Sequence, residues 1–180
     1  MRYTVVSRLL QPTTLGELDG ALTSRLKMLG RVFRDAGFPT AFTSDMNAWQ
    51  KTHVAWVSPV ANAIYMMHGD HRRLARTPHA LHLIVQAVRE GFTVLYKLGT
   101  PITPGKLRIW EWMPEPLLIR LLGLWAGTNH FRTVAVGHTM AASDEMRQLA
   151  EEFHALAEST STLTPAMDEL RSHIPKSLCD

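Results

Sequence analysis

The sequence lacks several features that would assign a protein to a class directly. A single cysteine, Cys179, excludes a disulfide framework and a four-thiolate metal site. The 19 Lys and Arg residues are scattered and offset by 16 acidic ones, which leaves a net charge of +3, and no nucleic-acid partner is expected. The most apolar window, residues 114–126, contains Glu115 and Arg120 and is too short to span a bilayer. We therefore expect a soluble, cytoplasmic protein without a membrane partner.

Recognisable catalytic and ligand-binding motifs are also missing. The sequence has no Gly-x-Ser-x-Gly elbow, no His-Glu-x-x-His, no phosphate-binding loop and no Gly-x-Gly-x-x-Gly turn for a dinucleotide. Two of its nine histidines, His68 and His71, are three residues apart, as are His79 and His82, but no carboxylate or thiolate accompanies them at a metal-ligand spacing. We expect no metal, and no way for this chain to hold a dinucleotide by itself.

What is present is a helical pattern. Hydrophobic residues make up 46% of the chain and charged residues 19%, the balance of a globular protein. Strand-like composition is confined to residues 3–10 and 13–15. Apolar periodicity, caps and prolines then predict helices over residues 22–33, 46–68, 78–98 and 130–158, short pieces up to Gly127, and a last helix from Pro165. The fold class expected is all-α, a helical bundle with a short N-terminal strand or hairpin.

The N-terminal strands have two interpretations. They form a local hairpin packed on the helices, or they belong to a sheet that the rest of this chain does not supply, because two strands alone are marginally stable in water. The residues alone do not distinguish the two.

Small and polar side chains form a stripe on the helix over residues 46–68. Lys51, Ala55, Ser58 and Asn62 follow helical spacing on a largely apolar helix, and Pro59 interrupts its hydrogen bonding beside Ser58. Such a stripe leaves room for a ligand and supplies donors to it. The alternative is a solvent-facing stripe with an extended lysine, and the residues alone favour that alternative.

Acidic residues gather on the long C-terminal helix. Asp144 and Glu145 follow the small residues of the run 141–143, where another helix or a ligand can approach closely. One of these two carboxylates is therefore a candidate for an inward-facing group, while the other acidic residues of this helix are expected to be solvated.

Three segments together resemble the C-terminal domain of the ketopantoate reductase (2-dehydropantoate 2-reductase) family. Residues 12–20 are similar to the crossover from the family's nucleotide domain to its helices. Residues 38–51 are similar to its short turn and following helix with a Trp-x-Lys motif, here Trp49-Gln50-Lys51. Asp144-Glu145-Met146, followed by Thr164-Pro165, resembles its acidic motif and closing helix.

The resemblance implies a helical bundle of the 6-phosphogluconate dehydrogenase C-terminal-domain type, with residues 1–18 as a crossover remnant and residues 19–180 as the substrate-binding and dimerisation domain. It implies that Lys51 is the general acid that protonates a ketone oxygen as hydride arrives from NADPH. It further implies that Glu145 orients the substrate and supports Lys51, while Ser58 and Asn62 supply further substrate contacts.

Two departures from the family bear on this implied function. The asparagine that the family carries four residues after the lysine is replaced by Ala55. The Rossmann half, with its glycine-rich turn, is not found in these 180 residues, so we expect a small keto acid to be reduced with NADP only when a nucleotide-binding domain is joined to the chain. The alternative is a non-catalytic helical module that associates through its apolar 117–125 segment and the strand over 3–10, as a homodimer.

Overall fold

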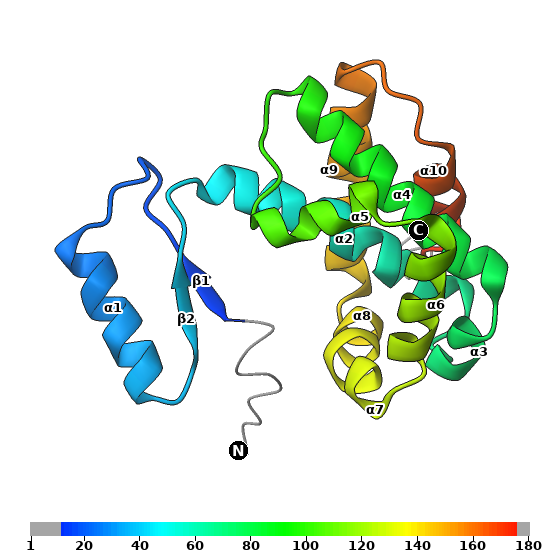
Figure 1. The fold of residues 1–180 in the computed structure, drawn as a ribbon, viewed down its shortest axis with the longest axis horizontal. Coiled ribbons are helices and arrows are strands. Elements are labelled where there is room, and N and C mark those ends of the chain that lie inside the picture. Colours follow the sequence, from blue (N-terminus) through cyan, green and yellow to red (C-terminus); the bar gives the residue numbers. More distant parts are fainter. Residues whose placement is uncertain (1–11, 176–180) are drawn as a thin grey trace. The chain divides into compact units, whose positions relative to one another are not determined.

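The computed structural model describes residues 12–175 (Figure 1). The chain divides between Gln50 and Lys51 into two compact units, of which residues 12–50 and 51–175 are described. The strand predicted over residues 3–10 and Cys179 lie outside the described residues. The described part is mostly helical, as the periodicity predicts, with two short strands in the first unit.

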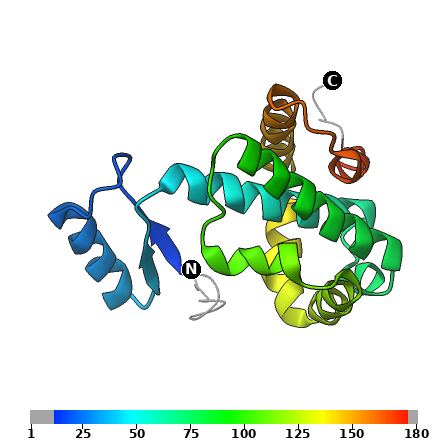
Figure 2. The same cartoon turned by 45° about the horizontal axis from the view of Figure 1, so that its top comes forward.

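The first unit is a β–α–β arrangement (Figure 2). Strands β1 (Thr13–Leu15) and β2 (Thr40–Phe42) pair in parallel, with Thr13 opposite Thr40, and helix α1 (Ser24–Asp35) connects them. Parallel strands need such a crossover and cannot be joined by a tight turn. The two described strands are thus not a hairpin, whereas the hairpin predicted for residues 3–10 and 13–15 includes a strand outside the described residues and stays a prediction. Strand β2 was not predicted, because three residues are too few to show an alternating pattern.

Local sequence explains how α1 begins and how it packs. The hydroxyl of Thr23 accepts the N–H of Leu26 at 3.1 Å, which caps the first turn. A Cβ at Gly30 would overlap the ring of Phe42, so any larger residue here would require that ring to move. Gly37 has a φ of +87° just after the helix, a left-handed conformation that other residues adopt at a cost.

The second unit is a bundle of helices around α4. In chain order its elements are most of α2 (Met46–Met66), α3 (His71–Ala75), α4 (Pro78–Lys97), the 3₁₀ turn η1 (Gly105–Arg108), α5 (Ile109–Trp112), α6 (Glu115–Ala126), α7 (Asn129–Phe131), the π-helical turn η2 (Arg132–Val136), α8 (Gly137–Ala141), α9 (Ser143–Ser159) and α10 (Pro165–Arg171). The predicted helices over 46–68 and 78–98 and the start at Pro165 are confirmed.

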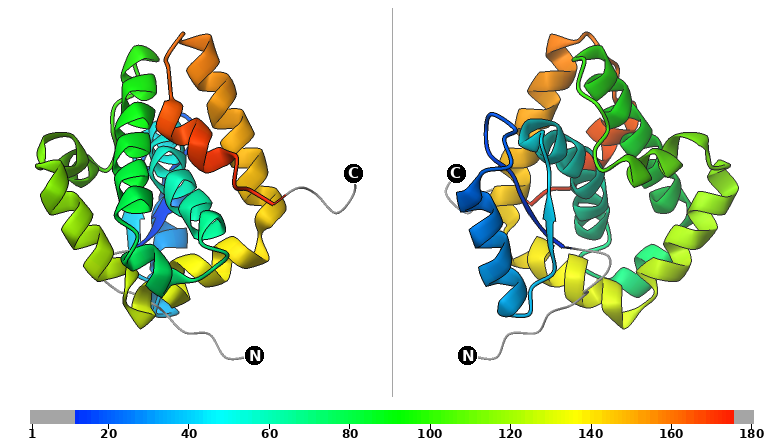
Figure 3. Two further views of the ribbon diagram at one scale, coloured as in Figure 1. Left: turned by 90° about the vertical axis from the view of Figure 1, so that its right-hand side faces the viewer. Right: turned by 60° about the vertical axis from the view of Figure 1, so that its left-hand side comes forward.

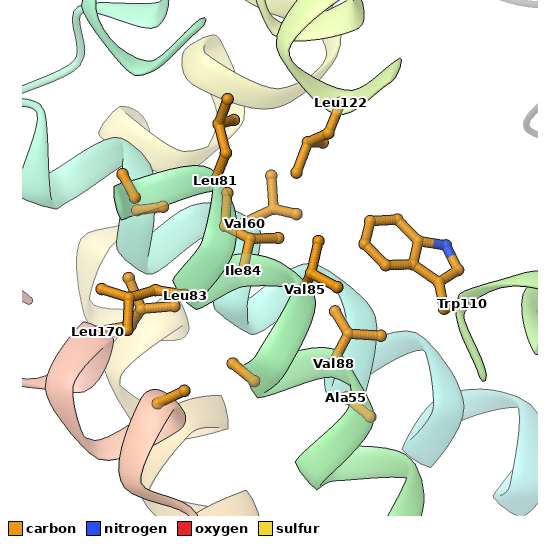
Figure 4. Packing of buried hydrophobic residues seen from close by; sticks show 14 of the residues in the cluster. Ala55, Val60, Leu81, Leu83, Ile84, Val85, Val88, Trp110, Leu122 and Leu170 are labelled. Atoms are coloured by element: carbon orange, nitrogen blue, oxygen red, sulfur yellow. The ribbon is translucent and has the colours of Figure 1, made fainter. Parts of the chain in front are cut away.

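Helix α4 is the centre of the core (Figure 4). Its Ile84, Val85 and Val88 are fully buried and lie among apolar side chains from α2, α5, α6 and α10. Burying one such side chain contributes about 1.5–3 kcal/mol to folding. Helix α10 packs mainly on α4 through Leu170, which is fully buried, and it lies beside α9 (Figure 3).

The single helix predicted over residues 130–158 is wrong. The chain passes through α7, the π turn and α8, and Ala142 leaves the helical region with φ −123° and ψ 44° before α9 begins. The carbonyl of Thr139, in the last turn of α8, accepts the hydroxyl of Tyr65 on α2. This hydrogen bond joins α8 to α2 between residues far apart in the sequence, so a long-range contact accompanies the break.

Candidate functional site

The small polar stripe of α2 faces the interior of the second unit. Ala55 is fully buried, Ser58 is 5% exposed and Asn62 is 3% exposed, so the solvent-facing interpretation is wrong for these three residues. Ser58 and Asn62 line a cavity of about 10 Å³ that α9 and α10 complete. By this measure the space suffices for about one water molecule.

Three charged or titratable side chains stand in the wall of this cavity. His154 of α9 lies with its Nδ1 atom 3.2 Å from Oδ1 of Asp168 on α10, and the guanidinium of Arg171 lies 3.7 Å from the same oxygen. The hydroxyl of Thr164 is 3.4 Å from the other carboxylate oxygen of Asp168. This polar cluster joins α9 to α10 beside Ser58 and Asn62.

The start of α10 is held by a carboxylate from α4. The backbone N–H groups of Ala166 and Met167 donate to Glu90 at 3.1 and 3.0 Å, which satisfies two of the donors that every helix leaves open in its first turn. Burial raises the pKa of Glu90, and these two hydrogen bonds oppose the shift without cancelling it.

The structure does not bring all four predicted site residues to the cavity. Lys51 is half-buried in the second turn of α2 and does not line it. Glu145 is exposed in the first turn of α9 and does not line it either. Only Ser58 and Asn62 of the four share this cavity, which is too small for a keto acid.

Ala55, for which the resemblance implies asparagine in the family, is fully buried against another helix. A Cβ built on Gly91 of α4 would lie 3.1 Å from the Cβ of Ala55. The two helices thus approach closely at position 55, which has no space for a ligand or for a larger polar side chain.

His154, Asp168 and Arg171 are the cavity residues that the sequence analysis did not single out. Asp168 and Arg171 are three residues apart on a short helix, a spacing that places them on one face, but this pattern is common on solvated helices. His154 pairs along its own helix with Glu158 at 3.4 Å, and its contact with Asp168 depends on the packing of α10 beside α9, which the sequence does not display.

A second hollow lies between α3 and the end of α6. Its volume is about 280 Å³, and it is lined by Arg72, Ala75, Arg76 and Gly127. Among the residues that the structure describes, neither arginine forms an ion pair, and both are exposed. The two arginines give the hollow a positive charge that is exposed to solvent, and the other two lining residues have no polar side chain.

No family model, curated protein or solved structure matches the chain.

Two further properties concern the described residues. Over residues 12–175 no helix is long and apolar enough to cross a membrane. In the same range no group of three or more His, Cys, Asp or Glu side chains is arranged to hold a metal ion.

Proposed function

We propose that this chain is the helical, substrate-binding part of a ketopantoate-reductase-like NAD(P)-dependent oxidoreductase that acts on a small 2-keto acid. The observation that carries the proposal is the parallel pairing of β1 and β2 through α1. Parallel strands occur almost only in sheets that helices cover, and a two-stranded sheet by itself is marginal. Such a β–α–β unit is typical of the nucleotide-binding sheets of this class of enzyme.

The outer surface of α1 supports the same proposal. Met28 and Val32 are each 59% exposed, although Leu26 and Gly30 already give α1 a buried face toward the strands. An α-helix with apolar residues on its outer side is typical of an element inside a larger domain. We infer that the β–α–β unit belongs to a more extensive sheet.

The described residues do not fit a dinucleotide by themselves. The segment that follows β1, Gly16 to Gly20, reads Gly-Glu-Leu-Asp-Gly, which lacks the third glycine and the spacing of a pyrophosphate-binding turn. NADP would accordingly be held by a nucleotide-binding domain outside these residues, and the chain alone is expected to be inactive.

Lys51 is the residue proposed for the chemistry. It lies in the second turn of α2 and is the lysine of the Trp49-Gln50-Lys51 motif on which the family resemblance rests. Its ammonium group would donate a proton to the ketone oxygen as negative charge develops there, and then recover a proton from solvent. Glu145 keeps the supporting role that the family resemblance implies. Ser58 and Asn62 do not, because their cavity is too small.

The direct test is binding of a keto acid to the chain as it exists. Titration of 2-oxoisovalerate, followed by ¹H–¹⁵N correlation spectra, should shift amides around Lys51 and the first turn of α9. Lys51→Ala should abolish the shifts, whereas Lys106→Ala, which removes an exposed lysine from η1, should leave them unchanged. Loss in both variants, or in neither, would contradict the proposal.

Catalysis gives a second test, with a nucleotide-binding domain joined to the N-terminus. In that protein Lys51→Ala should lower kcat for keto-acid reduction by roughly 10²–10⁴-fold, the usual contribution of a positioned acid. The 180-residue chain alone should oxidise no NADPH, and turnover by it would refute the assignment.

A second candidate function, self-association of a non-catalytic module, is favoured by α6. Leu117, Leu121 and Leu124 follow i, i+4, i+7 spacing and are 45%, 46% and 66% exposed, which leaves an apolar stripe on the outside of the second unit. If a second copy covers it, light scattering should give a dimer mass, and Leu121→Glu should give the monomer. Leu163→Glu, a change at an exposed leucine outside the stripe, is the matched control, and a monomeric wild type would exclude this candidate.

A further inference from the structure

The apolar stripe of α6 has a positively charged border. Leu117, Leu121 and Leu124 are 45%, 46% and 66% exposed and share one face of the helix. Arg120 lies beside this stripe, because it is one helical turn from Leu117 and one from Leu124, and it is exposed as well. Over residues 12–175 its guanidinium forms no ion pair.

Helix α3 adds to the same border. It packs on α6 (Figure 1), and its Arg72 and Arg76 line the hollow of about 280 Å³ at the end of α6. Gly127, which also lines the hollow, follows Arg120 by two turns on the same side of α6. The three arginines therefore lie along one edge of the leucine stripe.

The acidic residues of α3 and α6 do not pair with these arginines. The carboxylate of Asp70, which caps α3, accepts the backbone N–H groups of Arg72 and Arg73 at 3.0 Å. Glu115, the first residue of α6, contacts side chains of α4. The surface thus combines exposed leucines with three guanidinium groups that, in the described part of the chain, no carboxylate pairs with.

We propose that this surface of α3 and α6 docks on an anionic membrane. The leucines would lie at the boundary of the acyl chains, and Arg72, Arg76 and Arg120 would meet lipid phosphate groups, one of them in the hollow. Leucines on one face of a helix with basic residues beside them are typical of a helix that lies in the plane of the interface. The expectation of no membrane partner rests on the lack of a spanning segment, which this mode of binding does not need.

Charge and area distinguish the membrane from a second copy of the chain. A twofold dimer brings the same patch of both copies together, so Arg120 and its neighbours would face further positive charge. A standard protein interface buries about 800 Å² on each partner, through about 20–30 residues, whereas this stripe consists of three leucines. Binding to a membrane can use a few leucines and arginines because their contributions add to a weak, reversible association.

The inference goes beyond the proposed function. It involves neither Lys51 nor a nucleotide-binding domain, and it gives the outer face of α6 a role in a chain of either function.

Co-sedimentation of the 180-residue protein with vesicles tests the proposal. Vesicles of equal parts phosphatidylcholine and phosphatidylglycerol should bind the protein about 100-fold more tightly than phosphatidylcholine alone, since each of three arginines near an anionic surface contributes roughly fivefold. Sodium chloride should weaken the binding. Equal binding to the two vesicles, or to neither, would overturn the proposal.

Inorganic phosphate distinguishes a lipid surface from a site for the free anion. It should release no more protein from the mixed vesicles than sodium chloride of the same ionic strength does. A larger release would show that the arginines bind free phosphate, and the membrane assignment would then be wrong.

A matched pair of variants tests the leucine stripe. Leu124→Glu should lower binding to the mixed vesicles by about tenfold or more, because it removes apolar area and adds a negative charge. Leu163→Glu makes the same change at a leucine that is 89% exposed before α10, and it should lower binding much less. Equal losses, or a wild-type dimer that Leu121→Glu converts to a monomer, would count against the membrane.

A second pair tests the arginines. Arg72→Gln combined with Arg76→Gln should lower binding by about 25-fold. Lys27→Gln combined with Arg31→Gln removes the same charge from exposed positions of α1 and should have a much smaller effect. Similar losses in the two double variants would show attraction by net charge alone and would overturn the assignment to α3 and α6.

Discussion

Ala55 of α2 and Gly91 of α4 lie close together in the second unit, with 3.1 Å between the Cβ of Ala55 and a Cβ built on Gly91. A methyl group added at position 91 could not be accommodated by a side-chain rotation, because the atom it meets, the Cβ of Ala55, is attached directly to the α2 backbone. The contact also explains why the small stripe of α2 is buried: small residues are needed there for two helices to approach.

Gly91→Ala should therefore destabilise the protein, although alanine is the better helix former. Overpacking a core costs about 1–3 kcal/mol, whereas the gain in helix propensity is about 1 kcal/mol. We expect a net loss of about 1 kcal/mol in the free energy of unfolding, measured by urea titration. Gly137→Ala, at a helical glycine with open space around it, should be neutral or stabilising. In the double variant with Ala55→Gly the two changes should be coupled by about 0.5–3 kcal/mol; additivity would show that the two helices are not in contact.

Ala55→Asn, which introduces the residue that the proposed family resemblance would place here, should be strongly destabilising. It places an amide against Gly91 at a fully buried position, and about 3 kcal/mol or more should be lost through overpacking and an unpaired polar group. Comparing the thermal unfolding of Ala55→Asn with that of Ala55→Ser, which adds a polar group of smaller size, separates the effect of size from that of polarity. An asparagine that is tolerated and improves keto-acid binding would instead place position 55 in a substrate site.

Glu90→Gln should change how stability depends on pH. Burial raises the pKa of Glu90 in the folded state, so above about pH 4.3, the ordinary value for glutamate, the unfolded chain releases this proton before the folded one does. The contribution of Glu90 to stability is thus present below that pH and is lost as pH rises through the folded-state pKa. Urea titrations from about pH 4 to 7 should show a fall with pH that Glu90→Gln reduces. Glu152→Gln, on the exposed side of α9, is the control and should leave the slope as in the wild type.

Arg89→Met should weaken the attachment of the turn between α5 and α6 to α4, the helix that carries Arg89. The guanidinium of Arg89 donates to the carbonyls of Trp110 and Met113 at 2.9 and 2.8 Å and pairs with Glu115 at 3.2 Å. Its removal leaves the carbonyls of Trp110 and Met113 without this donor, while Glu115 keeps its contacts with His82 and Gln86, and we expect a loss of about 3 kcal/mol in the free energy of unfolding. The control is Arg108→Met, which breaks an exposed ion pair with Glu111 and should change stability by less than about 1 kcal/mol. Similar losses in the two variants would contradict the prediction.

Local sequence was sufficient wherever a local signal sets the structure. The Thr77-Pro78 start and the Gly99 end bound α4 because proline fits the first helical position and glycine, here with φ +68°, fits the turn after the last one. The apolar spacing of α2 likewise predicted its extent to within two residues. These elements are determined by contacts within one turn of the helix, which the sequence displays directly.

Tertiary structure alone decided the remaining features. The break at Ala142 lies three positions after Thr139, whose carbonyl accepts a hydrogen bond from Tyr65, 74 positions away, and alanine itself favours helix. The strand β2 exists because α1 returns the chain beside β1. The polar cavity exists because α10 brings Asp168 and Arg171 to Asn62. The sequence by itself determined the extents of α1, α2 and α4 to within two residues and the start of α10, through caps, prolines and periodicity. Which of their side chains meet was decided by packing, since contacts between distant segments leave no periodic signal along the chain.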